Sequence, residues 1–381
     1  MSVREDRGAG GRDRPIPLRI AQIAPLWTSL PPATYGGTEL MVHLLTEELV
    51  RRGHDVTLFA AGDTTTKARL EAVVERHLLA AMADGQAQDY EHYAHAALAA
   101  TFERASAFDV IHCHLGCAFV PFARLSPVPM VFSLGTVVTT DDAWVLQRHP
   151  DILVSVRSRQ QVAALARELR ERVHVIANAC DFTAFEPTSR PGAYLAFLGR
   201  MSPVKNPLGA IEIARRVDMP IVLAGAPITR DEREFFTHRV RPLIDSRRVR
   251  YAGPVNHAEK NELLRHAAAL LFPVRWPEPF GIVMIEAMAC GTPVVACARG
   301  AVPEVIAPGR TGYFADTVDE LVALVPKALA LDRRVVRRAA EERFSHARMA
   351  DDYLDAYRMA SQTAGCRNPA RRWSRDEARR R

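Results

Sequence analysis

The sequence predicts an α/β protein with two Rossmann-like domains, each built on a parallel sheet. Short apolar runs of strand length alternate with helix-like segments over residues 18–180, and the alternation restarts over 194–345. This alternation is typical of βαβ units. The length of 381 residues is sufficient for two domains of about 100–200 residues each. Two such halves joined by a short linker are expected to bind a ligand in the cleft between them.

The first half begins with the apolar run LRIAQIA, residues 18–24, which has the length of a strand. Apolar residues at helical spacing follow over 38–52 and end at Gly53. Further strands are expected at 55–61, 109–112, 129–134, 152–156 and 173–177, with helix-like stretches at 66–82, 89–106 and 158–171.

The second half follows a predicted linker, residues 181–193, that contains two prolines and a glycine. Strands are expected at 194–198, 220–224, 249–252, 269–272, 293–296 and 312–315. Helices are expected at 206–217, 230–245, 257–267, 281–289 and 317–330, with a C-terminal helix over 346–365. Residues 1–17 are predicted to be a disordered leader and 366–381 a disordered basic tail.

Composition and charge limit the class of partner. The formal charge of +6 lies mainly at the two ends, which leaves residues 20–365 near −1. A near-neutral body argues against nucleic-acid binding, although the basic tail permits peripheral membrane contact. There is neither an apolar run of about 18 residues nor a signal-peptide core, so we expect a cytoplasmic protein. The six cysteines show no framework spacing and are expected to be reduced.

The segment WPEPFGIVMIEAMACGTPVV, residues 276–295, carries the sharpest chemical signal. Glu278 lies in a Pro-flanked loop after a predicted strand, and Glu286 lies eight residues later in the helix that follows. The backbone N–H groups of Gly281, Ile282 and Val283 are expected to be unpaired at the helix start, where an anionic or hydroxyl-rich ligand binds well. Alternatively, Glu286 only complements the helix dipole, and Glu278 is only a solvent-exposed polar residue of the loop.

In each half, the loop after the first strand carries a further motif. In FLGRMSPVKNP, residues 197–207, Arg200 and Lys205 are expected to bind a diphosphate. The alternative is a solvated loop that happens to carry two cations. In YGGTEL, residues 35–40, Gly36 and Gly37 permit close approach of the backbone to a phosphate or sugar. Only four of the 50 basic residues are lysines (Lys67, Lys205, Lys260 and Lys327), so each is worth inspecting.

The segment EPFGIVMIE resembles the E-x7-E signature of retaining glycosyltransferases with the GT-B fold. The resemblance continues through AMACGTPVVACARGAVPEVI to glycosyltransferase family 4 and covers about residues 18–345. It implies that Glu286 binds the nucleotide ribose, Glu278 the donor sugar, and Arg200 with Lys205 the diphosphate. It also implies that Gly36 and Gly37 face the diphosphate from the acceptor domain.

One departure from the family pattern bears on activity. Family members commonly carry a His after the strand that corresponds to 129–134, whereas this chain reads SLGTVVTT there. Either Thr136 or Thr139 makes the sugar contact, or the donor lacks the hydroxyl, or activity is impaired.

The predicted function is therefore transfer of a hexosyl group, with retention, from a nucleoside diphosphate sugar to an acceptor hydroxyl. The acceptor class stays open among small molecules, lipids and glycans. The alternatives are a catalytically impaired sugar-nucleotide-binding protein, and a pseudo-glycosyltransferase or phosphorylase of the same fold. A dehydrogenase is disfavoured because no G-x-G-x-x-G follows a strand.

No cofactor beyond the donor is expected. The chain contains no D-x-D, so we also expect catalysis without a metal ion. The cluster His112, Cys113, His114 and Cys117 is interpreted as a buried strand end in preference to a metal site.

Overall fold

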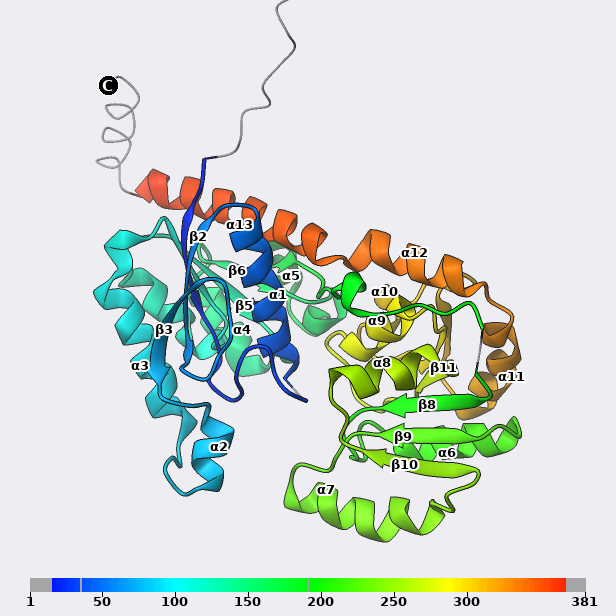
Figure 1. Ribbon diagram of the computed structural model, residues 1–381. Coiled ribbons are helices and arrows are strands. Elements are labelled where there is room, and N and C mark those ends of the chain that lie inside the picture. Colours follow the sequence, from blue (N-terminus) through cyan, green and yellow to red (C-terminus); the bar gives the residue numbers. More distant parts are fainter. Residues whose placement is uncertain (1–15, 35, 191, 368–381) are drawn as a thin grey trace, which may run out of the picture.

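A computed structural model describes residues 16–34, 36–190 and 192–367 and contains two α/β domains side by side (Figure 1). Of the predicted leader and tail, only residues 16, 17, 366 and 367 fall inside these ranges. Each domain is built on one sheet, and every pairing between neighbouring strands is parallel. The predicted α/β class with two parallel sheets is confirmed.

The first sheet has seven strands in the order β3-β2-β1-β4-β5-β6-β7. One of them contradicts the sequence expectation, because part of the helix-like stretch 66–82 is the edge strand β3. Its residues are only half-buried, so alternation along this strand is weak in the sequence. The strands are β1 (Arg19–Ile23), β2 (Asp55–Ala61), β3 (Arg69–Val74), β4 (Val110–Cys113), β5 (Met130–Leu134), β6 (Leu153–Val156) and β7 (His174–Val175).

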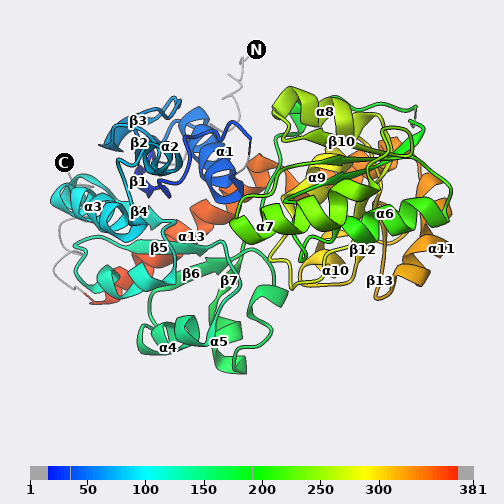
Figure 2. The same cartoon turned by 90° about the horizontal axis from the view of Figure 1, so that it is seen from below.

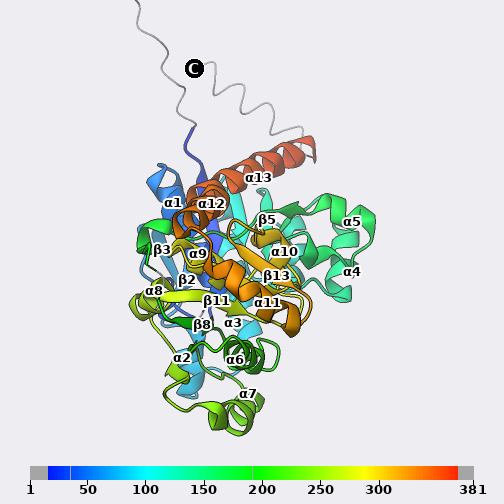
Figure 3. The same cartoon turned by 90° about the vertical axis from the view of Figure 1, so that its right-hand side faces the viewer.

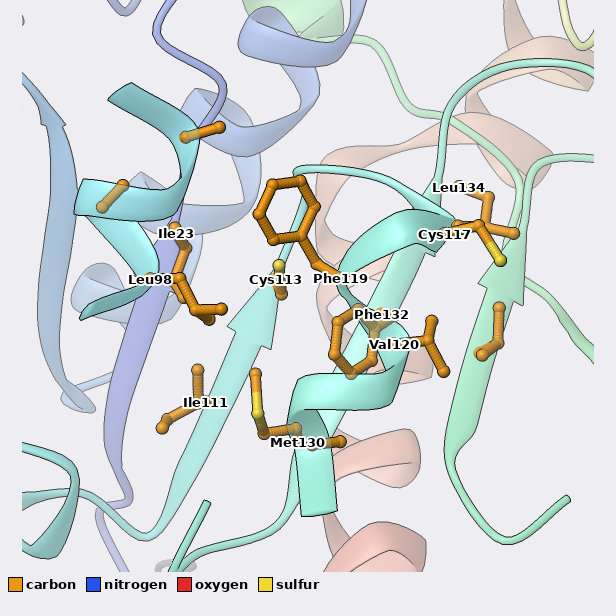
Figure 4. Packing of buried hydrophobic residues seen from close by; sticks show 14 of the residues in the cluster. Ile23, Leu98, Ile111, Cys113, Cys117, Phe119, Val120, Met130, Phe132 and Leu134 are labelled. Atoms are coloured by element: carbon orange, nitrogen blue, oxygen red, sulfur yellow. The ribbon is translucent and has the colours of Figure 1, made fainter. Parts of the chain in front are cut away.

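Helices cover both faces of this sheet (Figure 2), so its central strands are buried and mostly apolar, apart from polar side chains such as Gln22, His112 and Ser133. On one face, Ile111, Met130 and Phe132 pack against Phe119, Val120 and Leu98 (Figure 4). The helices of this domain are α1 (Gly37–Arg51), α2 (Leu78–Ala83), α3 (Tyr90–Glu103), α4 (Thr140–Arg148) and α5 (Arg167–Arg172).

The second sheet has six strands in the order β10-β9-β8-β11-β12-β13. The strands are β8 (Tyr194–Leu198), β9 (Ile221–Ala224), β10 (Val249–Gly253), β11 (Ala267–Phe272), β12 (Val294–Cys297) and β13 (Gly312–Ala315). The helices are α6 (Pro207–Arg216), α7 (Arg230–Phe235), α8 (His257–Arg265), α9 (Ile282–Ala289), α10 (Val302–Val305), α11 (Val318–Leu329) and α12 (Arg333–Phe344). Figure 3, viewed from the side of this domain, shows α11 and α12 on its outer side.

The chain then returns to the first domain in a long helix, α13 (His346–Arg367), which runs across the top of Figure 1 in continuation of α12. Figure 2 shows α13 behind strands β5 and β6. Tyr353 and Tyr357 on this helix are buried, and their hydroxyl groups bond to polar side chains of the first sheet. Among the described residues, no helix has the length and apolar character needed to cross a bilayer.

The topology gathers the loops that carry the sequence motifs. In a parallel sheet all strands end at the same edge, so the segments after them lie together. Gly36 and Gly37 follow β1, Arg200 and Lys205 follow β8, and Glu278 follows β11, which is the neighbour of β8.

Candidate functional site

The two predicted carboxylates lie at the start of α9, one before the helix and one within it. Gly281 is the N-cap residue of α9, and Glu286 is the fifth residue of the helix. Both residues are almost buried, with 7% of the whole residue exposed for Glu278 and 5% for Glu286. Charged groups at this burial need partners, and each glutamate has one.

Glu278 is held by a lysine and a tryptophan. Its Oε2 atom accepts hydrogen bonds from Lys205 Nζ and, at 2.7 Å, from Trp276 Nε1. Lys205 Nζ also lies 5.1 Å from the centre of the Trp276 ring. Lys205 thus neutralises the Glu278 carboxylate. Its ammonium group is held in this contact and is not a solvated cation on a surface loop.

The backbone of Glu278 is fixed as firmly as its side chain. Its carbonyl oxygen accepts a hydrogen bond from the Ala301 N–H at 2.8 Å. Gly300, with φ of 59°, packs so closely that a Cβ atom there would lie 2.2 Å from the same oxygen. A glycine at 300 is therefore required for the loop to hold this position.

Glu286 is paired with Lys260, a residue of α8 that the sequence motifs did not include. The side chain of Lys260 is 16% exposed and that of Glu286 is 7% exposed. The scarcity of lysine was the one sequence signal that pointed to Lys260. Two of the four lysines therefore pair with the two glutamates of the E-x7-E segment.

Arg200 occupies a different environment from Lys205. Its Nη1 atom donates to Glu232 Oε1 at 2.8 Å, and Glu232 also completes the capping box at the start of α7. The Arg200 Nε atom is buried and has no partner among the described residues. The structure thus joins Lys205 to Glu278 but places Arg200 against α7, and it leaves the buried Nε–H without an acceptor among the described residues.

The glycine loop of the first domain meets the start of α9. A Cβ atom at Gly37, the first residue of α1, would lie 3.3 Å from Ile282 Cδ1. Gly36 is the N-cap residue of the same helix. The starts of α1 and α9, with their unpaired backbone N–H groups, are therefore close together across the domain interface.

A second set of contacts crosses this interface. Ser158 Oγ donates to the Pro279 carbonyl oxygen at 2.8 Å. The Glu304 carboxylate accepts the backbone N–H groups of Arg159 at 3.0 Å and Gln160 at 2.9 Å. Ser158 carries no local signal, because its partner is 121 residues away in the chain.

The segment after β5, where family members commonly carry a His, has no His in this chain. The segment after β5 begins with Gly135, where a Cβ atom would lie 2.8 Å from Thr38 Oγ1. Thr139 is already engaged, since its hydroxyl belongs to the capping box of α4 with Asp142. Thr38 and Thr136 also lie at this point, and neither hydroxyl has a hydrogen bond among the described residues.

His112 and His114 form part of a buried hydrogen-bonded cluster under α13. The His112 ring bonds to Tyr357 Oη at 2.8 Å and to Ser133 Oγ at 2.7 Å, and His114 Nε2 bonds to Gln22 Oε1 at 2.7 Å. Burial holds the pKa of both rings well below the usual value for histidine. The described residues contain no group of three or more His, Cys, Asp or Glu side chains placed to hold a metal ion.

Comparison with known families identifies the chain. A model of the family described as "Glycosyl transferases group 1" matches residues 184–343, and a model described as "Glycosyltransferase Family 4" matches residues 35–184. Together the two matches run through both domains. The chain belongs to the family 4, group 1 glycosyltransferases. The predicted membership of glycosyltransferase family 4 is thereby confirmed.

Individual relatives are more distant. D-inositol 3-phosphate glycosyltransferase of Mycolicibacterium smegmatis is 28% identical over 267 residues, which cover 64% of this chain and 59% of the relative. The chain thus matches somewhat over half the length of this curated relative.

Solved structures show the same fold over about nine-tenths of the chain. AviGT4, a glycosyltransferase involved in avilamycin A biosynthesis, superposes with a TM-score of 0.70 at 24% identity, covering 91% of this chain and 98% of that one. HepE of Anabaena, solved in complex with UDP, superposes with a TM-score of 0.67 at 20% identity, covering 89% and 99%. These neighbours confirm the GT-B fold.

Proposed function

We propose that this glycosyltransferase moves a sugar from a nucleoside diphosphate sugar to an acceptor hydroxyl, with retention at the anomeric carbon. The observation that carries the proposal is the pairing of Glu278 with Lys205 and of Glu286 with Lys260 at the start of α9. The complex of HepE with UDP and the family membership support a nucleotide donor. Retention is proposed from the resemblance of the E-x7-E segment.

In this mechanism the second domain binds the donor. Glu286 accepts hydrogen bonds from the ribose hydroxyls, and Glu278 accepts them from the sugar. When the bond between the anomeric carbon and the diphosphate oxygen breaks, the electron pair remains on the diphosphate. The acceptor oxygen forms the new bond to the anomeric carbon, and its proton passes to the departing diphosphate. In this proposal Lys205, Arg200 and the N–H groups of Gly281, Ile282 and Val283 stabilise that charge without a metal ion.

The first domain binds the acceptor. The loop of Gly36 and Gly37 faces the start of α9 and lets the acceptor and the diphosphate approach each other closely. The donor charge must partly displace the ion pair between Lys205 and Glu278, so donor binding and rearrangement of this pair are coupled. When Lys205 binds the diphosphate, the Glu278 carboxylate becomes free to accept hydrogen bonds from the sugar hydroxyls.

The test is a panel of nucleoside diphosphate sugars with thermal-shift detection, followed by transfer to candidate acceptors. We expect one nucleotide class to raise Tm, since a ligand that binds the folded state stabilises it. Proton NMR of the product then reports the anomeric configuration. Inversion would contradict the retaining assignment, and a rise in Tm without transfer or donor hydrolysis would favour a second candidate.

That second candidate is a sugar-nucleotide-binding protein with impaired catalysis. It is favoured by the segment after β5, where Gly135 packs against Thr38 and no His is present. The thermal shift and the transfer assay separate the two functions, because only the enzyme turns the donor over.

A further inference from the structure

A basic hollow lies on the second domain, between α12 and the segment that links the two sheets. Its volume is about 320 Å³, near the lower end of the range of about 300–1,000 Å³ for small-molecule sites. Four arginines and a single carboxylate line it, together with two hydroxyl side chains. The lining residues are Pro187, Thr188, Ser189, Arg333, Arg334, Arg337, Arg338 and Glu341.

Two of the arginines form a fixed, charged floor. Arg333, which is 6% exposed, donates to the carbonyl oxygens of Thr188, Ala267 and Arg265 at 2.8 Å each. Arg337 donates to the carbonyl oxygens of Phe185 at 2.9 Å and Phe182 at 2.6 Å. These acceptors are neutral. Among the described residues Arg333 has no carboxylate partner, and Glu341 lies 4.0 Å from Arg337 Nε. The positive charges of Arg333 and Arg337 are therefore balanced mainly by carbonyl oxygens, with Glu341 as the one carboxylate within 4.0 Å among the described residues.

The other two arginines form the rim. Arg334 and Arg338 are exposed, lie one turn apart on α12, and have no side-chain partner among the described residues. Among the described residues Asp332 forms no ion pair with either side chain. Its carboxylate accepts the backbone N–H of Arg334 at 2.8 Å. Packing explains Arg333 and Arg337, but it does not explain why Arg334 and Arg338 line the same hollow.

We propose that this hollow binds a phosphate monoester through Arg334 and Arg338, with the hydroxyl of Ser189 at its edge. Arginine forks bind phosphate oxygens in pairs, and the charged floor adds attraction without bonding directly. The volume fits a phosphate attached to a small polar group. The hollow lies at the C-terminal end of α9, where Arg333 and Arg337 bond to the Cys290 and Ala289 carbonyl oxygens, whereas the proposed donor site lies at the N-terminal end. It is thus a second site, and the proposal does not depend on the proposed function.

The ligand has two possible sources, a soluble phosphate monoester or a lipid headgroup. Hydrogen exchange with inorganic phosphate tests the first source. We expect protection in peptides that cover 186–190 and 332–341, and at least about tenfold weaker binding in R334Q/R338Q, since a hydrogen bond to a charged group contributes about 1.5–3 kcal/mol. Co-sedimentation with phosphatidic acid vesicles tests the second source, with phosphatidylserine vesicles as the control for charge alone.

The matched control is R167Q/R170Q on α5, which removes the same charge from exposed positions of the other domain. We expect it to leave both measurements unchanged within about twofold. Loss of binding in R334Q/R338Q alone, in either assay, supports the site and assigns its source. Protection confined to the loop of Lys205, equal binding by both double variants, or no binding of either probe would overturn the proposal. Unchanged Tm in R334Q/R338Q verifies that the variant is folded.

Discussion

Lys205 neutralises Glu278 in the structure, and in the proposed function it also binds the donor diphosphate. We expect Lys205→Ala to lose about 10²–10³ in kcat, the usual cost of removing one preorganised charge donor. Stability should fall as well, by about 1–3 kcal/mol, because Glu278 stays nearly buried with only Trp276 as partner. Lys205→Arg should recover only part of the turnover.

Steady-state kinetics and urea unfolding measure both effects. The control is Lys327→Ala, an exposed lysine on α11 of the same domain. Normal kcat for Lys205→Ala at saturating donor would remove Lys205 from the mechanism.

The two glutamates should separate in their kinetic effects. Glu286→Ala should weaken nucleoside diphosphate binding by at least about tenfold, because it removes the ribose acceptor and leaves Lys260 unpaired. Glu278→Ala should lower kcat more than it weakens nucleotide binding. Calorimetric titration with UDP, ADP and GDP, beside kcat, distinguishes them. Glu262→Ala, an exposed residue of α8, is the control. Equal nucleotide affinity in Glu286→Ala and the wild type would disprove the ribose role.

Helix α13 depends on polar contacts as well as apolar packing. Tyr353 Oη bonds to Ser133 Oγ at 2.8 Å and to Arg157 Nη1 at 2.6 Å, and the Arg157 residue is 3% exposed. We expect Tyr353→Phe to lower the free energy of unfolding by about 1–3 kcal/mol, because buried donors lose their acceptor. Urea unfolding measures this loss.

Tyr93→Phe is the matched control, since Tyr93 is half-buried on α3 and has no hydrogen bond among the described residues. If the two variants were equally stable, the contacts of α13 with the sheet would not contribute through hydrogen bonds.

The buried histidines give the whole protein a pH-dependent stability. Burial lowers the pKa of His112 and His114 in the folded state, and the nearby Arg157 charge lowers them further. The unfolded chain takes up these protons near pH 6.5. Below that pH the unfolded state binds more protons than the folded state, so stability falls as pH falls, by up to about 1.4 kcal/mol per pH unit for each ring.

Urea unfolding at intervals from pH 8 to pH 5 measures this slope. His112→Asn should make the slope shallower, whatever its effect at pH 8, whereas His92→Gln at an exposed position of α3 should not. A slope that is the same in His112→Asn and the wild type would refute the prediction for that ring.

Whether sugar transfer needs a metal ion is a property of the whole site, which both domains form. We expect transfer to survive treatment with a chelator followed by dialysis, because Lys205, Arg200 and the start of α9 supply the positive charge. The measurement is kcat before and after treatment. Activity that vanishes and returns only with Mg²⁺ or Mn²⁺ would contradict this expectation.

Local sequence determined the strand–loop–helix context of Glu278 and Glu286 and most strands of both sheets. Apolar periodicity and glycine positions act over a few residues, so they can be recognised without the rest of the chain. The edge strand β3 escaped recognition because its half-buried side chains carry a weak alternation. It needs β2 as its partner before its structure is fixed.

Only the tertiary structure decided which partners the site residues have. Lys260 reaches Glu286 from 26 positions away, Arg200 reaches Glu232 from 32, and Tyr353 reaches Ser133 from 220. Such pairs depend on which strands lie side by side and on where α13 crosses back. The sequence alone therefore determined the two domains and the family motif, but the charge balance of the site depends on contacts between distant segments, which no local pattern encodes.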